Sequence, residues 1–213
     1  MNEILTAGPQ RAPAHVLLAH GAGAPMTSPF MAAMTGLLIE RGVKVSRFEF
    51  AYMAARRRNG KRTPPPKAER LIGEYEAVVA RLAARGAGPE RLVIGGKSMG
   101  GRVASLIADK LHLDGLAAGL VCLGYPFHPP GKPDQVRTQH LERLVCPMLI
   151  VQGERDPFGA RGEVESYRLS PAIRFHWAAG GDHDLAPRRG TRATHPENLS
   201  QAARSIASFA LSL

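Results

Sequence analysis

The chain has 213 residues, of which 44% are hydrophobic and 22% charged. This length suffices for one well-buried core but is short for two, so we expect a single domain over residues 1–213. Lysine and arginine outnumber aspartate and glutamate by 28 to 18, a formal net charge of +10 that attracts anionic substrates or acidic partners. No run of 18 apolar residues is present, and the basic stretches lack interleaved aromatic residues, so neither a membrane nor a nucleic acid is expected as a partner.

Short apolar runs alternate with amphipathic segments along the chain, which predicts a mostly parallel sheet with helices on both faces. The runs are continuous rather than alternating, as in strands that are covered on both sides. The predicted strands are His15 to Ala19, Val43 to Phe48, Arg91 to Ile94, Ala118 to Leu123, Met148 to Val151 and Ile173 to Trp177.

Three helices are predicted between and after these strands from apolar residues at helical spacing. Gly42 and Gly86 are placed to end the first two, and Pro196 takes the first position of the third. The apolar faces are Phe30, Met34, Leu37 and Leu38; Leu71, Tyr75, Val78, Val79 and Leu82; and Leu199, Ala202, Ala203, Ile206 and Phe209.

Three stretches read as loops: Tyr52 to Pro66, Gly124 to Pro133 and Pro187 to His195. The gap after the fourth strand, Gly124 to Val145, is too short for an inserted lid domain. We therefore expect a site that is open to solvent.

The sharpest motif is G-x-S-x-G at Gly96 to Gly100, directly after an apolar strand and before a helix. A serine at such a turn adopts a strained backbone conformation that points Oγ out of the sheet. The N–H of Met99, at the positive end of the helix, is then available to an oxyanion. Ser98 is the predicted nucleophile.

This segment allows two other interpretations. A phosphate-binding P-loop would need glycine five residues before Gly96, where the chain has Arg91, and it would replace a predicted strand by a loop. A serine that only caps the following helix remains the structural alternative.

A serine needs a base, and the base needs a carboxylate partner. His183 follows the strand that ends at Trp177, where two glycines let the chain turn. Asp156 follows the strand before it, and the order serine, aspartate, histidine is the one expected of this fold. Glu154 is the alternative carboxylate.

The loop after the first predicted strand supplies a second oxyanion donor. Its glycines permit a tight turn that exposes the N–H of Ala22, with Gly23 as the next candidate. His20 reads as a structural residue that braces this loop.

No cofactor is expected. No metal site is expected either, because histidines and carboxylates do not occur at the spacing of metal ligands. The one metal-like triplet is Asp182, His183 and Asp184. Residues 1–15 lack a signal-peptide core, and Cys122 and Cys146 form no disulfide framework, so we expect a cytoplasmic protein.

With these residues in view, the chain resembles the α/β-hydrolase superfamily over nearly its whole length. The chain resembles the bacterial dienelactone-hydrolase-like group in the segments AHGAGAPMTSPFM, RFEFAYMAARRRNGKRTPPP, GGKSMGGR, GYPFHPP and GERDPFG. That group is similar to the hydrolase-like domains of testis-expressed protein 30 and of the third regulatory subunit of the NSL acetyltransferase complex. The resemblance implies a minimal α/β-hydrolase without a lid and a triad of Ser98, Asp156 and His183.

The predicted function is hydrolysis of a small ester or thioester through an acyl-serine. The alternative is a protein-binding module on a hydrolase scaffold, which would use the basic stretch Arg56 to Arg62 to recruit an acidic partner. Arg56 and Arg57 follow the second strand. If the protein is a hydrolase, they are candidates for selecting an anionic substrate. Oligomeric state is left open.

Overall fold

The computed structural model describes residues 3–60, 64–84 and 91–213. One seven-stranded sheet runs through them in the order β1-β3-β2-β4-β5-β6-β7. Strands β2 to β7 are parallel to one another, and only β1 runs antiparallel, along β3. The strands are β1 (Ile4–Ala7), β2 (Ala14–Ala19), β3 (Lys44–Phe48), β4 (Arg91–Lys97), β5 (Gly119–Leu123), β6 (Met148–Gly153) and β7 (Ile173–Ala178).

The strands predicted from the sequence are confirmed, with ends that shift by at most a few residues. The edge strand β1 was not predicted. It is short and half-exposed, and its ordering depends on pairing with β3, from Ile4 opposite Phe48 to Ala7 opposite Val45. A partner that lies so far along the chain leaves no local signal.

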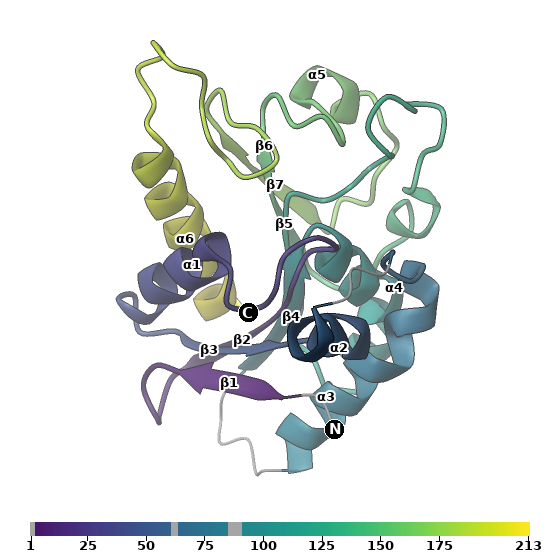
Figure 1. Cartoon of the computed structure of the whole chain (residues 1–213), viewed down its shortest axis with the longest axis vertical. Coiled ribbons are helices and arrows are strands. Elements are labelled where there is room, and N and C mark those ends of the chain that lie inside the picture. Colours follow the sequence, from purple (N-terminus) through teal and green to yellow (C-terminus); the bar gives the residue numbers. More distant parts are fainter. Residues whose placement is uncertain (1–2, 61–63, 85–90) are drawn as a thin grey trace.

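Helices cover both faces of the sheet, as predicted (Figure 1). Helices α1 (Pro29–Ile39) and α6 (His195–Ser212) pack on one face, and α3 (Ile72–Ala84) and α4 (Met99–Leu113) on the other. Two short helices, α5 (Arg161–Val164) and η2 (Gln139–Leu141), lie in the connections around β6, and η1 (Ala68–Leu71) precedes α3. Gly86, the predicted end of the second helix, lies outside the described residues.

Each face of the sheet has its own apolar core. Strand residues alternate between the two, so Leu17 and Ile94 face α3 and α4, whereas Val16 and Val93 face α1 and α6. All four side chains are fully buried. This two-sided burial explains the continuous apolar runs in the sequence.

The prediction that Tyr52 to Pro66 is a loop was wrong for its first part, because α2 spans Ala51–Asn59. This helix buries only Met53, so it shows no apolar periodicity. Good helix-forming residues, basic residues in its last turn and Gly60 in the left-handed conformation (φ 69°) stabilise it instead.

The predicted loop at Pro187 to His195 ends where α6 begins, at His195. Thr194 and Glu197 form a reciprocal capping box there, and Pro196, predicted at the first position of the helix, is its second residue.

Among the described residues, no further domain is inserted between the strands, in keeping with the predicted absence of a lid. No helix in that part of the chain combines the length and apolar character that crossing a bilayer requires.

Candidate active site

The predicted site residues converge at the carboxyl ends of the central strands. Strands β2 and β4 are neighbours, and the chain leaves them in opposite directions, toward β3 and toward β5. Such a switch in strand order opens a crevice at the sheet edge, which is where open α/β sheets bind ligands. Ser98 directly follows β4, and the Ala22 loop follows β2.

Ser98 occupies a strained turn between β4 and α4. Its backbone lies at φ 52° and ψ −117°, a region that residues other than glycine rarely adopt. The bend brings the first turn of α4 against β2, so a Cβ on Gly100 would lie 2.5 Å from the carbonyl oxygen of Ala19. The predicted strain is present, and glycine is required at position 100 for steric reasons.

Ser98, His183 and Asp156 form one continuous hydrogen-bonded chain. His183 Nδ1 lies 2.8 Å from Asp156 Oδ2, and His183 Nε2 lies 2.9 Å from Ser98 Oγ. Because a carboxylate only accepts, we assign the imidazole proton to Nδ1, which leaves Nε2 to accept from the serine hydroxyl. This is the arrangement that general-base activation of a hydroxyl requires.

Asp156 is fully buried and held by groups besides His183. The backbone N–H of Phe158 donates to its Oδ1 at 2.9 Å, and Gln152 Nε2 donates to its Oδ2 at 3.0 Å. The alternative carboxylate, Glu154, is engaged elsewhere, because it accepts from the N–H of Gly180 and pairs with Arg161.

Gln152 is a supporting residue that the sequence analysis missed. It is fully buried at the end of β6, where its Oε1 also accepts from the N–H of Tyr125 at 2.7 Å. It therefore joins β6, the loop after β5 and Asp156. The available signal was an amide side chain at the end of an otherwise apolar strand.

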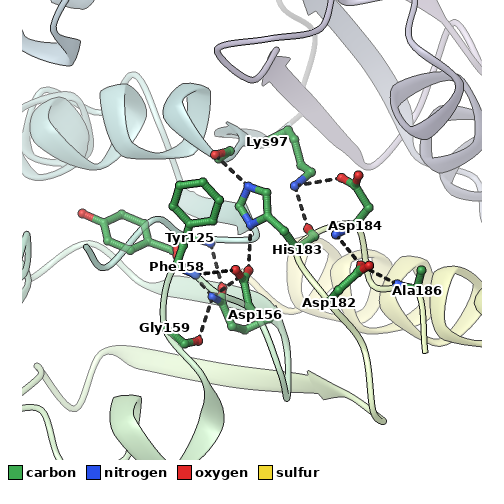
Figure 2. A network of polar contacts seen from close by, with 11 residues as sticks. Lys97, Tyr125, Asp156, Phe158, Gly159, Asp182, His183, Asp184 and Ala186 are labelled. Atoms are coloured by element: carbon green, nitrogen blue, oxygen red, sulfur yellow. Dashed lines mark hydrogen bonds and ion pairs between the residues drawn. The ribbon is translucent and has the colours of Figure 1, made fainter. Parts of the chain in front are cut away.

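The imidazole of His183 is enclosed by close packing on two sides. The ring of Phe158 lies against it with centroids 4.2 Å apart, as Figure 2 shows. On another side is the backbone of Gly124, at φ 66°, where a Cβ would lie 3.1 Å from His183 Cε1. The ring is thus confined to the orientation that joins Ser98 to Asp156.

The loop that carries His183 is tied down by its own polar groups. The carboxylate of Asp182 accepts from the N–H groups of Asp184 and Ala186, both at 2.9 Å. From α6, Asn198 donates to the carbonyl of Leu185 at 2.8 Å. Asp182 therefore shapes the turn rather than orienting the imidazole.

Lys97, the residue before Ser98, is a second residue of the site that the sequence analysis missed. Its side chain is only 9% exposed, and Nζ lies 2.7 Å from the carbonyl oxygen of His183 and 3.2 Å from Asp184 Oδ1 (Figure 2). Burial lowers the pKa of this ammonium group, while the nearby Asp184 carboxylate opposes that shift.

The two predicted oxyanion donors lie beside Ser98. Ala22 and Met99 line the same cavity as the serine. Met99 begins α4, whose first N–H groups have no partner within the helix. The next peptide, between Ala22 and Gly23, is held by Tyr52, whose hydroxyl donates to the Ala22 carbonyl at 3.0 Å.

His20 supports that loop from beneath, as predicted. Its Nε2 accepts from the N–H of Phe50 at 3.2 Å, so the ring proton is on Nδ1, which donates to the carbonyl of Gly21 at 2.7 Å. Burial lowers the pKa of His20, which favours this neutral form.

Two cavities meet at Ser98. The larger has a volume of about 750 Å³ and extends toward α1 and α6, with Phe30, Met31 and Leu199 in its walls. The smaller, about 410 Å³, extends toward η1 and the first turn of α4. Ser98, Ala22 and Phe158 line both, so Phe158 stands at their boundary.

The predicted substrate-binding arginines lie elsewhere. Arg57 pairs with the buried Glu49 at 3.1 Å and with Glu3 at 2.6 Å, and Arg56 donates to the carbonyl of Gly23 at 3.3 Å. Neither side chain lines either cavity at Ser98. These contacts favour a role for Arg57 in attaching α2 and a role for Arg56 in bracing the Ala22 loop. Arg62, from the same basic stretch, lies outside the described residues.

The histidine, cysteine and acidic side chains of the described residues form no group of three or more that could hold a metal ion. The three residues of the metal-like triplet have different partners. Asp182 accepts from the N–H of Ala186, His183 contacts Ser98, and Asp184 pairs with Lys97.

Comparison with solved structures gives the same fold at low sequence identity. An α/β serine hydrolase homologue from Coxiella burnetii superposes with a TM-score of 0.70 at 18% identity, covering 97% of this chain and 90% of that one. The esterase domain of a Rhodothermus marinus protein gives 0.66 at 14%, covering 100% and 98%. Dienelactone hydrolase from Anabaena variabilis gives 0.68 at 19%, covering 98% and 90%.

A family model described as an alpha/beta hydrolase domain matches residues 12–211, which is nearly the whole chain. The sheet order, the strained serine turn after β4 and the residues brought to the sheet edge agree with that match. The chain therefore belongs to the α/β-hydrolase domain family.

Proposed function

We propose that this protein is a serine hydrolase that cleaves an ester or thioester bond of a small substrate through an acyl-serine intermediate. The observation that carries the proposal is the hydrogen-bonded chain from Ser98 Oγ through His183 to the buried Asp156, with distances of 2.9 and 2.8 Å. The serine hydrolase and esterase names of structural neighbours support it.

In the first half of the reaction, His183 Nε2 takes the proton of Ser98 as Oγ attacks the substrate carbonyl carbon. The carbonyl oxygen gains negative charge, which the N–H groups of Ala22 and Met99 are proposed to stabilise. Asp156 stabilises the imidazolium. His183 then returns the proton to the departing alkoxide or thiolate, and the acyl group stays on Ser98.

In the second half, water takes the place of the leaving group. His183 Nε2 accepts a proton from that water as its oxygen attacks the acyl carbon, and the same proton then goes to Ser98 Oγ as the carboxylic acid leaves. The confinement of the imidazole by Phe158 and Gly124 supports this double use, because the ring does not need to reorient between steps.

We further propose a place in the dienelactone-hydrolase-like group, on the sequence segments noted above and the likeness to the Anabaena variabilis enzyme. The nucleophile differs from the cysteine of true dienelactone hydrolases, so this proposal concerns ancestry and not substrate.

The test is a fluorophosphonate probe, which phosphonylates an activated serine Oγ and releases fluoride, combined with a panel of p-nitrophenyl esters and acyl thioesters. We expect labelling of the wild-type protein that Ser98→Ala abolishes, with turnover lower by about 10⁴- to 10⁶-fold. Ser208→Ala, an exposed serine on α6, is the matched control and should label and turn over as wild type.

Folded wild-type protein that neither labels nor hydrolyses any member of the panel would contradict the proposal. That outcome would favour the alternative, a protein-binding module on a hydrolase scaffold. Equal turnover by Ser98→Ala and wild type would show that hydrolysis takes place elsewhere.

A further inference from the structure

The smaller cavity beside Ser98 carries an unusual concentration of positive charge. Three cationic side chains line it, Lys67, Arg102 and Arg137, against a single carboxylate, that of Glu69. They come from three separate segments: the approach to η1, the first turns of α4, and the loop between β5 and η2. The tertiary fold therefore brings together charges that would repel one another without an anion between them.

Arg102 lies one helical turn after the nucleophile, and its N–H donates to the carbonyl of Ser98 at 3.0 Å. Its side chain is 18% exposed, and one terminal nitrogen pairs with Glu69 Oε1 at 2.6 Å. The Nε atom of Arg102 is buried and has no hydrogen-bond partner in the described part of the chain. The contact of Arg102 with Glu69 therefore uses only part of the hydrogen-bonding capacity of a guanidinium group that lines the cavity.

Arg137 is held in place by its backbone while its guanidinium stays available. Its N–H donates to the carbonyl of Phe127 at 2.7 Å, and its carbonyl accepts from the Tyr125 hydroxyl at 3.0 Å. Its side chain forms no ion pair with a carboxylate among residues 3–60, 64–84 and 91–213. Arg137 and Arg102 line the same cavity, and burial, followed by the charge of Arg102, lowers the pKa of Arg137.

The larger cavity differs in character. Its charged lining residues Lys97 and Asp184 pair with each other at 3.2 Å, and its other walls include Phe30, Met31 and Leu199. Ser98 thus lies between an apolar cavity and a cationic one. A substrate whose scissile bond sits at Oγ would extend into both.

Building on the proposed hydrolysis, we propose that the smaller cavity is an anion-binding subsite, and that the substrate is an ester or thioester with a carboxylate or phosphate on one side of the scissile bond and an apolar group on the other. Arg102 and Arg137 are the specificity-determining residues, because guanidinium groups bind both anions through paired hydrogen bonds. Lys67, which is exposed at the cavity edge, adds long-range attraction.

Matched substrate pairs test this directly. In the first pair, mono-4-nitrophenyl glutarate carries a charge on the acyl side and 4-nitrophenyl valerate is its neutral counterpart. In the second pair, 4-acetoxybenzoate carries the charge on the leaving group and its methyl ester is neutral. A phosphate counterpart, 4-acetoxyphenyl phosphate against 4-acetoxyanisole, separates the two anions. We expect kcat/KM to favour the charged member of at least one pair by about tenfold or more, the scale of one charge-assisted hydrogen bond.

The charged-to-neutral ratio of kcat/KM is the readout for variants. It should fall toward one in Arg137→Met and Arg102→Met, mainly through KM, and it should fall with rising salt. Arg58→Met, an exposed arginine on α2, is the matched control and should keep the wild-type ratio. The inference is overturned if no charged member is preferred, if the preference survives both substitutions, or if Arg56→Ala and Arg57→Ala abolish it instead.

A binding measurement separates this inference from the proposed function. Titration calorimetry of Ser98→Ala with the same esters requires no turnover. Suppose that Ser98→Ala binds the charged esters selectively, that Arg137→Met removes this selectivity, and that the wild-type protein hydrolyses none of them. That result would support the anion-binding subsite and refute the proposed hydrolase function. If the protein instead hydrolyses charged and neutral esters at equal rates and binds them equally, the result would support the proposed hydrolase function and refute the anion-binding subsite.

Discussion

Lys97 Nζ lies 2.7 Å from the backbone carbonyl oxygen of His183, so the residue that precedes the proposed nucleophile, Ser98, holds the residue proposed to activate it. The contact joins the end of β4 to the loop after β7, two segments that meet only in the folded protein. It fixes the main chain of His183, while Asp156 fixes the ring. Lys97 is a positioning residue, since it reaches the reaction only through His183.

The first prediction concerns this contact. Lys97→Met keeps most of the side-chain volume but removes the donor, and we expect kcat/KM to fall about 10- to 100-fold, because small displacements of a base are costly. Asp184→Asn, which weakens only the exposed partner of Lys97, should cost about threefold or less. Steady-state kinetics on a neutral p-nitrophenyl ester measures both. Wild-type kcat/KM in Lys97→Met, or an equal loss in Asp184→Asn, would disprove the role.

The second prediction concerns Gln152, which is fully buried and serves both Tyr125 and Asp156. Gln152→Met leaves the buried Tyr125 N–H without an acceptor and removes one of the two donors to Asp156 Oδ2, the other being His183. We expect a loss of about 1 to 3 kcal/mol in the free energy of unfolding, with reduced kcat. Urea titration gives the first quantity. The exposed Gln201→Met in α6 should change stability by less than about 0.5 kcal/mol. Equal stabilities of the two variants would refute this account.

The third prediction concerns Gly100, where a Cβ would lie 2.5 Å from Ala19 O and 2.6 Å from His20 O. Both atoms belong to the main chain and cannot turn away, so Gly100→Ala should destabilise the fold by about 3 kcal/mol or more, or prevent folding. Gly36→Ala is the matched control within α1, where a Cβ would meet nothing within 4 Å. It should stabilise the protein by about 0.5 to 1 kcal/mol. Thermal unfolding that ranks Gly100→Ala at or above wild type would contradict the steric argument.

The fourth prediction concerns pH and His140. Burial, and next the charge of Arg102, lower its pKa from 6.5 to about 4, against smaller opposing effects of Asp109 and Glu69. Between pH 4 and 6.5 the unfolded chain therefore binds more protons at this site than the folded protein, so stability is lost as pH falls through that window.

His140→Asn removes this titration. Comparing urea unfolding at pH 7 and pH 4.5, we expect the wild type to lose more stability than the variant, by on the order of 1 kcal/mol after allowance for partial exposure. The difference between the two losses is the quantity to test, because other groups titrate in both proteins. Identical losses would show that His140 does not contribute.

Several features of the site could be predicted because their signals are local. The strained turn at Ser98 is encoded by adjacent glycines between an apolar strand and a helix, and the structure has the predicted backbone conformation there. His183 and Asp156 each follow an apolar strand, and parallel strands deliver their carboxyl ends to one sheet edge. Helix α2 was missed for the opposite reason, because a helix that buries only Met53 has no apolar period to detect.

By itself the sequence determined the sheet class, the serine turn and which strand ends carry polar groups, since backbone preference and two-sided burial act within a few residues of the chain. Only the tertiary structure decided that Asp156 rather than Glu154 meets His183, that Lys97 and Gln152 support the relay, and that Arg102 and Arg137 line one cavity while Arg56 and Arg57 do not. Those outcomes depend on distances and directions between segments far apart in sequence, and such distances are set by how the layers pack.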